Sequence, residues 1–100
     1  MKQTLLLSSV GISNMATTIL DVSTKEKFRK SHIIGSINIP YNEIESELEN
    51  IKKMQPLIIC CATGELSDWA YKFLKIKGLE DIHQGGNWDT VAFLIQKFKK

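Results

Sequence analysis

The stretch Pro56-Leu57-Ile58-Ile59-Cys60, with the segment Cys61-Ala62-Thr63-Gly64-Glu65-Leu66-Ser67 that follows it, decides the fold that we expect. A continuous apolar run after a proline is typical of a central strand of a parallel sheet, buried on both faces. The small residues and Gly64 then predict a tight loop, and a helix should begin near Ser67. A strand, a loop and a helix in this order indicate an α/β domain.

The rest of the chain repeats this alternation of strands and helices. Further strands are expected at Leu5–Leu7, Thr17–Val22, Ile33–Ile39 and Leu79–His83. A short helix is expected over Thr24–Lys30, with Ser23 or Thr24 as its N-cap. Other helices are indicated by apolar residues at helical spacing: Ile44, Leu48 and Ile51 from Asn42 onwards; Trp69, Ala70, Phe73 and Ile76, ending at Gly78; and Val91, Leu94, Ile95 and Phe98. Gly85-Gly86 should turn the chain before the last helix. We therefore expect one domain over residues 1–100, with helices covering both sides of a parallel sheet.

Composition narrows the class of protein. There are 13 lysines and arginines against 11 acidic residues, and the basic residues are spread along the chain without interleaved aromatics, so we expect no nucleic-acid partner. No run of 18 or more apolar residues exists, so no membrane span is expected. The N-terminus has a charge and a short apolar stretch, as a signal peptide would, but Ser8 and Ser9 interrupt the stretch and no convincing cleavage site follows. Neighbouring cysteines such as Cys60 and Cys61 rarely form a disulfide, so we expect a reducing, cytoplasmic location.

Cys61 is the candidate nucleophile at the predicted ligand-binding edge of the sheet. In open parallel sheets, ligands bind beyond the C-terminal ends of the strands, and Cys61 follows such a strand. The loop amides can form an anion-binding nest there, and the N-terminus of the next helix adds partial positive charge. Such surroundings favour the nucleophilic thiolate and would hold the charge of a persulfide. Many free cysteines are inert packing residues, an alternative that stays open for Cys61 and is favoured for Cys60.

Several motifs resemble the rhodanese domain family, over roughly residues 17 to 86. Ile19-Leu-Asp-Val-Ser23 and His32-Ile-Ile-Gly-Ser-Ile-Asn-Ile-Pro40 are similar to the family's Asp-Val-Arg turn and its His-Ile-x-Gly-Ala-x-Asn-x-Pro segment. Ile59-Cys-Cys61-x-x-Gly64-x-x-Ser67 is similar to the family's active-site loop, and Gly85-Gly86 resembles its late double glycine.

The resemblance implies a three-layer α/β/α sandwich around a mostly parallel sheet of about five strands, and an activity that passes sulfur through a cysteine persulfide. It assigns the nucleophile to Cys61, which has Gly64 and Ser67 at the family's distances. The transferred sulfur is then held by the backbone of Ala62, Thr63, Gly64, Glu65 and Leu66, with Ser67 at the helix start. The implied partners are small sulfur donors and thiol acceptors, or a protein donor or acceptor. No cofactor is implied.

The sequence departs from the family at the cations that usually accompany thiosulfate use. The two loop positions where arginine is common hold Ala62 and Leu66, and Glu65 adds a negative charge. Ser23 stands in place of the arginine of the Asp-Val-Arg turn. A cation beside a sulfur dianion contributes about 1–3 kcal/mol. We therefore expect Cys61 to pass sulfane sulfur to a thiol, cyanide or a protein acceptor, with weak use of thiosulfate.

Other polar residues are interpreted mainly as structural. The resemblance places His32 in a turn, whereas His83 should lie at the same edge as Cys61, where it could contact a ligand. Asp21 is expected to bond to backbone in its turn. Two roles are considered for Gln84, Asn87 and Trp88. They form the rim of the pocket, or they pack against and cap the last helix. Adjacent cysteines cannot easily both bind one tetrahedral ion, so no metal site is expected.

Two other functions are considered for the cysteine loop. A phosphatase or arsenate reductase loop ends in an arginine that binds the oxyanion, but the corresponding place holds Ser67 when counted from Cys61 and Leu66 when counted from Cys60. Neither residue suits phosphate. The other alternative is a non-catalytic or redox-sensing module that keeps the fold. The missing arginines favour it, and the presence of Cys61 argues against it.

Overall fold

The computed structural model describes the backbone of residues 17–99 and the side chains of residues 17–93. In this part of the chain, four parallel strands form one sheet in the order β2-β1-β3-β4. The strands are β1 (Thr18–Asp21), β2 (Ile37–Asn38), β3 (Leu57–Cys61) and β4 (Ile82–Asn87). The helices are α1 (Lys25–Lys30), α2 (Leu48–Lys53), α3 (Glu65–Ile76) and α4 (Trp88–Lys99), with a short 3₁₀ helix, η1 (Tyr41–Glu43).

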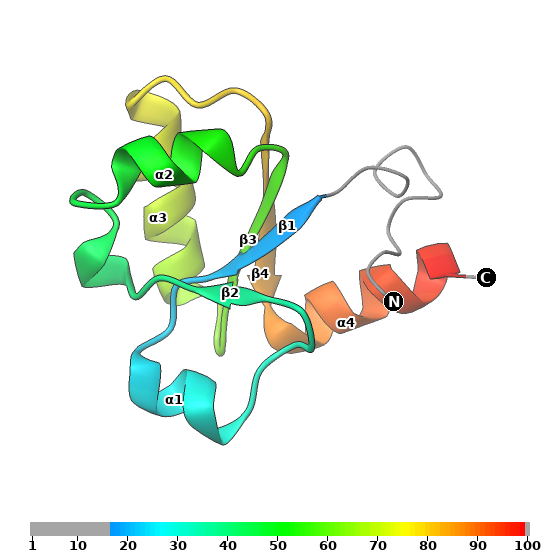
Figure 1. Cartoon of the computed structure of the whole chain (residues 1–100). Coiled ribbons are helices and arrows are strands. Elements are labelled where there is room, and N and C mark those ends of the chain that lie inside the picture. Colours follow the sequence, from blue (N-terminus) through cyan, green and yellow to red (C-terminus); the bar gives the residue numbers. More distant parts are fainter. Residues whose placement is uncertain (1–16, 100) are drawn as a thin grey trace.

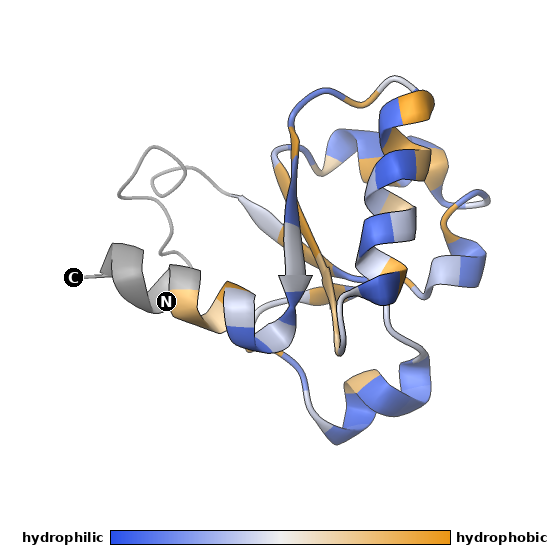
Figure 2. Cartoon of the chain, turned by 180° about the vertical axis from the view of Figure 1, so that it is seen from behind, coloured by the Kyte–Doolittle hydropathy of each residue, from blue (hydrophilic) through white to orange (hydrophobic). Residues whose placement is uncertain are grey.

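Helices cover both faces of the sheet, which gives three layers (Figure 1). Leu57, Ile59 and Cys61 of β3 pack in the core beneath α2 and α3, whereas Ile58 and Cys60 pack on the side of α4. A strand covered on both faces needs apolar residues at every position. All of β3 is buried, and Figure 2 shows it as hydrophobic along its length, while α1 is mostly hydrophilic. The predicted α/β/α architecture is confirmed.

The observed strands lie where the sequence predicts them, but some differ in length from the prediction. The strands expected at Thr17–Val22 and Leu57–Cys60 are present as β1 and β3. The one expected at Ile33–Ile39 is reduced to β2, because the chain turns first: the Ser36 N–H and hydroxyl both bind the Ile33 carbonyl oxygen, at 3.0 and 2.6 Å. The expected strand Leu5–Leu7 lies outside the described residues, which contain four strands where about five are expected for the whole chain.

The first two helices show what local spacing can and cannot predict. The helix expected over Thr24–Lys30 is α1, and Thr24 is its N-cap, with its Oγ1 accepting from the Lys27 N–H at 3.2 Å. The helix expected from Asn42 is split into η1 and α2, because the residues between them form tighter three-residue turns. Its apolar anchors Ile44 and Ile51 are nevertheless fully buried.

The face that α3 buries differs in part from the expected one. Trp69 and Ile76 are 48% and 81% exposed. Of the expected stripe, Ala70 is buried and Phe73 packs against the core, as predicted, and the other buried residues of the helix are Ser67 and Leu74. The Ser67 hydroxyl, on the buried face at the start of the helix, donates to the carbonyl oxygen of Gly86 on β4, at 3.2 Å. Gly78 follows the helix with a φ of 99°, as expected of a C-terminal glycine.

Gly85 and Gly86 lie inside β4 and do not turn the chain, contrary to the prediction. Ile59 pairs with Gln84 and Cys60 pairs with Gly86, so Gly85 is the extra residue of a β-bulge. The last strand therefore runs further along the chain than the expected Leu79–His83 and continues beside the end of β3.

Gly85 also lets α4 pack closely on the sheet. A Cβ atom at this position would lie 2.7 Å from Val91 Cγ2 and 2.8 Å from Ile58 Cγ2, so only glycine fits.

Within the described residues, no helix has both the length and the apolar character needed to cross a membrane.

Candidate active site

Cys61 is the last residue of β3, and the chain turns directly after it into α3. Gly64 is the N-cap residue of α3 and has a φ of 100°, a left-handed conformation that glycine adopts without strain. The helix begins at Glu65, slightly before the expected start. This turn places the N-terminus of a 12-residue helix next to the thiol.

Two backbone amides of this segment donate to the Cys61 thiol. The Gly64 N–H lies 3.0 Å from Sγ, and the Ser67 N–H lies 3.3 Å from it. Both amides belong to the start of α3, which carries partial positive charge. Amides that converge at a helix start stabilise negative charge placed between them. The arrangement therefore suits an anionic sulfur.

The thiol is almost closed to solvent. Cys61 is 1% exposed, whereas reactive cysteines usually occupy partly exposed positions. The loop above it is more open, because Thr63 and Glu65 are exposed.

The other loop residues do not all face the thiol. The Ala62 N–H donates to Ser23 Oγ instead, at 3.0 Å. The side chain of Leu66 packs against the hydrophobic core beneath α3, and the side chains of Thr63 and Glu65 are exposed. A role of these four loop residues in holding sulfur stays a prediction.

Ser67 connects the loop to the neighbouring strand. It is fully buried, and its hydroxyl lies 3.0 Å from the Gly64 carbonyl oxygen and 3.2 Å from that of Gly86. The single hydroxyl hydrogen is shared between these two acceptors. Ser67 therefore joins the loop, α3 and β4 around the thiol.

Asp21 supports the same region from the end of β1. It is fully buried, and its Oδ1 accepts from the Ser23 N–H at 2.8 Å, which confirms the expected turn contact. Its Oδ2 accepts from the Trp88 Nε1–H at 2.7 Å. Trp88 is therefore a packing residue, one of the two roles considered for it. Sequence reasoning misses this pair because 67 positions separate the two residues.

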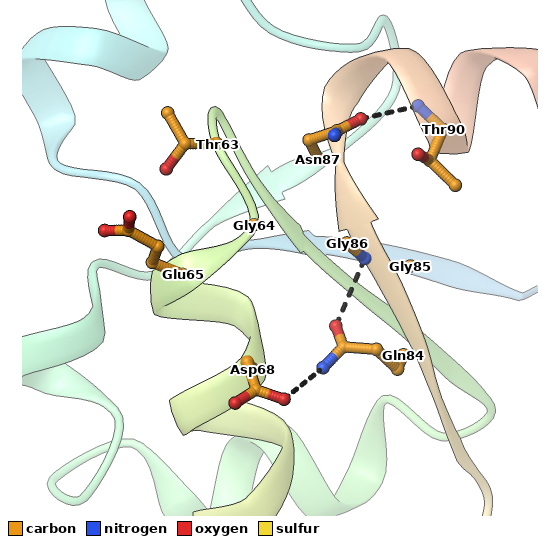
Figure 3. Close-up of a pocket in the computed structure, with 9 residues that line it drawn as sticks. All are labelled: Thr63, Gly64, Glu65, Asp68, Gln84, Gly85, Gly86, Asn87 and Thr90. Atoms are coloured by element: carbon orange, nitrogen blue, oxygen red, sulfur yellow. Dashed lines mark hydrogen bonds between the residues drawn. The ribbon is translucent and has the colours of Figure 1, made fainter.

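A surface pocket of about 680 Å³ adjoins the loop (Figure 3). It is lined by Thr63, Gly64, Glu65, Asp68, Gln84, Gly85, Gly86, Asn87 and Thr90. Gln84 extends from β4 toward Asp68 of α3, with its Nε2 3.4 Å from Oδ1 (Figure 3), and Asn87 caps α4 by accepting from the Thr90 N–H at 2.7 Å. Cys61 does not line the pocket, but Gly64 does, so loop backbone separates the pocket from the thiol.

Cys60 points to the opposite face of the sheet, toward α4. Burial raises the pKa of its thiol far above the ordinary value, and the negative charges of Asp21 and Cys61 raise it further. Cys60 is therefore a neutral packing residue, in agreement with the prediction.

The two histidines lie away from the thiol. His32 stacks on Phe28, and its Nδ1 lies 2.6 Å from the Phe28 carbonyl oxygen, which makes it a structural residue. His83 pairs with Ile58, whereas Asn87, further along β4, pairs with Cys61. This corresponds to roughly 13 Å of strand, so the expectation that His83 shares an edge with Cys61 is wrong. Within residues 17–93, no three His, Cys, Asp or Glu side chains are grouped as metal ligands.

Comparisons with known proteins agree with this fold and loop. Residues 6–94 match the Rhodanese-like domain family. The candidate sulfur carrier protein YrkF of Bacillus subtilis is 30% identical over 70 residues, which cover 70% of this chain and 38% of that protein. The adenylyltransferase and sulfurtransferase UBA4 of Meyerozyma guilliermondii is 30% identical over 80 residues, which cover 72% of this chain and 19% of that protein.

The chain thus spans well under half the length of either curated relative. Among solved structures, a rhodanese with anions from E. coli has a TM-score of 0.69 at 24% identity, covering 77% of this chain and 93% of that one, and it shares the fold. With the family match extending over residues 6–94, the chain belongs to the Rhodanese-like domain family.

Proposed function

We propose that the domain is a sulfurtransferase that carries sulfane sulfur as a persulfide on Cys61. The observation that supports this most directly is the pair of amides, from Gly64 and Ser67, at 3.0 and 3.3 Å from Sγ. These donors belong to fixed backbone at a helix start, so they need little reorganisation when charge develops on sulfur. The names of the relatives, a sulfur carrier and a sulfurtransferase, support the same class of reaction.

The transfer has two balanced steps. The Cys61 thiolate attacks the outer sulfur of a persulfide donor, R–S–SH, so that the Sγ–S bond forms as the donor's S–S bond breaks. The electron pair of the broken bond leaves with the donor as its thiolate. An acceptor thiolate then attacks the same outer sulfur, forms a new persulfide and regenerates the Cys61 thiolate. The sulfane sulfur keeps its oxidation level throughout, so no external oxidant or reductant is needed.

The charges around the loop favour donors other than thiosulfate. Ala62 and Leu66 bring no cation, and the charged residues that line the adjoining pocket are Glu65 and Asp68. Asp68 is paired with Lys72 at 3.1 Å, whereas Glu65 has no ion pair within the described part of the chain. Among the described residues that line the pocket, a dianion therefore meets no cationic side chain. Persulfides of small thiols or of proteins should load Cys61 faster, and thiols, cyanide or a protein should accept the sulfur.

Access to the thiol is part of the proposal. Because Cys61 is 1% exposed, loading requires a displacement of the exposed loop around Thr63. Thr63 is exposed, so this displacement should slow loading without preventing it.

Mass spectrometry after donor treatment tests the proposal. Wild type, Cys61→Ser and Cys60→Ala are incubated with thiosulfate, glutathione persulfide or a protein persulfide, and the intact mass is measured. Wild type and Cys60→Ala should gain the mass of one sulfur atom from persulfide donors, and less from thiosulfate. Equal gain by Cys61→Ser would refute the assignment.

One alternative is a non-catalytic or redox-sensing module, and the burial of Cys61 favours its non-catalytic form, because a redox-sensing thiol needs solvent access. In that case the folded wild-type protein would acquire no sulfur from any donor in the panel. Loading by any sulfane donor that depends on Cys61 would exclude the alternative.

A further inference from the structure

Ser23 makes a direct contact with the first peptide of the cysteine loop. Its Oγ accepts from the Ala62 N–H at 3.0 Å, and the residue is 1% exposed. The bond is partly buried, with its acceptor closed to solvent, so breaking it carries a desolvation cost. The peptide that immediately follows Cys61 is therefore held in one orientation, with its N–H directed to Ser23.

Ser23 is itself held from several sides. Its N–H donates to Asp21 Oδ1 at 2.8 Å, and its carbonyl oxygen accepts from Asn38 Nδ2 at 3.0 Å. Asp21 in turn accepts from the Trp88 indole at 2.7 Å. The acceptor for the Ala62 amide thus belongs to a network that joins β1, β2 and the start of α4, and its position is fixed by parts of the chain outside the loop.

The orientation of this first peptide determines which amides face the thiol. With the Ala62 N–H turned to Ser23, the loop reaches Gly64 in the left-handed conformation, and the amides of Gly64 and Ser67 meet Sγ. A peptide free to rotate after Cys61 would let these two amides move away from the sulfur.

We propose that Ser23 is a positioning residue for Cys61, which acts by accepting the Ala62 N–H and so holds the Gly64 and Ser67 amides on Sγ. This inference rests on the proposed function, because it concerns the charged sulfur that those amides stabilise. The role needs a compact side-chain acceptor. Serine and threonine supply a hydroxyl oxygen, whereas alanine has none and arginine only donates.

The rate of Cys61 alkylation by a neutral reagent, measured against pH, tests the inference. The midpoint of the profile reports how well the site stabilises the anionic sulfur, and the plateau at high pH reports access. Ser23→Ala should move the midpoint to higher pH and lower the rate at neutral pH by about three- to tenfold, the effect of one hydrogen bond. Ser23→Thr, which keeps the oxygen, should restore the wild-type midpoint.

Ser36→Ala is the matched control, because the Ser36 hydroxyl donates to the Ile33 carbonyl oxygen, within its own turn. Its midpoint should equal that of wild type. An unchanged midpoint in Ser23→Ala, or the same shift in Ser36→Ala, would overturn the inference. If Ser23→Ala does not fold, hydrogen exchange on wild type decides: the Ala62 amide should be protected, and rapid exchange would overturn the inference.

Persulfide loading separates this inference from the proposed function. If no donor loads wild type, the proposed function fails, while the alkylation profiles still decide the role of Ser23. If wild type is loaded, Ser23→Ala should be loaded more slowly at neutral pH by the factor found in alkylation. Equal loading rates would overturn the positioning role alone.

Discussion

Replacing Cys60 by alanine should remove a pH dependence from the stability of the domain. Cys60 is fully buried on the α4 side of the sheet, and burial, followed by the charges of Asp21 and Cys61, raises the pKa of its thiol far above the ordinary value. The unfolded chain loses this proton near pH 8.5, whereas the folded chain keeps it. Above that pH the folded state binds one more proton than the unfolded state, so the free energy of unfolding falls as the pH rises.

The size of the effect follows from this one proton. The free energy of unfolding should fall by about 1.4 kcal/mol for each pH unit above the ordinary thiol pKa. Between about pH 8.5 and pH 10 the loss amounts to about 2 kcal/mol, a large share of the roughly 5–15 kcal/mol that stabilises a typical domain. Below about pH 8.5 the contribution of Cys60 is fully present and independent of pH.

Urea denaturation under reducing conditions at a series of pH values measures this slope. Lysines and tyrosines also titrate at alkaline pH, but they are common to wild type and Cys60→Ala, so the difference between the two proteins isolates the thiol. Cys61→Ala keeps Cys60 and should keep its contribution to the slope. Parallel profiles for wild type and Cys60→Ala would refute the reasoning, because they would mean that Cys60 ionises equally in both states.

Two further substitutions test the packing that supports the loop. Gly85→Ala should lower the free energy of unfolding by about 1–3 kcal/mol, because the added Cβ meets Val91 and Ile58 at 2.7 and 2.8 Å; a urea midpoint equal to that of wild type would contradict this close contact. Trp88→Phe should cost about 1–3 kcal/mol in the same assay, because it leaves the buried Asp21 Oδ2 without its donor. The control Trp69→Phe, at a position 48% exposed, should change stability by less than about 0.5 kcal/mol, and equal costs at the two tryptophans would argue against the buried bond.

The location of the candidate site could be predicted because local sequence determines it. The apolar run Leu57–Cys60 is typical of a buried strand, and Gly64, three residues after Cys61, supplies the left-handed turn that starts the next helix. The distance from strand end to helix start is then fixed by a few residues of backbone. For the same reason, Thr24 could be identified as a helix cap.

Features decided by distant contacts could not be predicted. Trp69 follows the helical spacing of an apolar stripe, yet it is 48% exposed, whereas Ser67, whose hydroxyl reaches the Gly86 carbonyl oxygen of β4, lies on the buried face of α3. The register of β4 against β3 places His83 opposite Ile58, so it lies at the wrong end of the strand for contact with Cys61. Spacing alone carries no information on which side chain a neighbouring strand will bind.

The pleat of β3 has a consequence for sulfur chemistry. Consecutive cysteines on one strand project from opposite sides of the sheet, so their thiols occupy separate compartments although their Cα atoms are only about 3.8 Å apart. Their Cβ vectors diverge, which prevents a bond between the two sulfurs without breaking the strand. A sulfur atom loaded onto position 61 therefore cannot be resolved by the neighbouring thiol of Cys60, and its discharge depends on a thiol that approaches from the side of the loop.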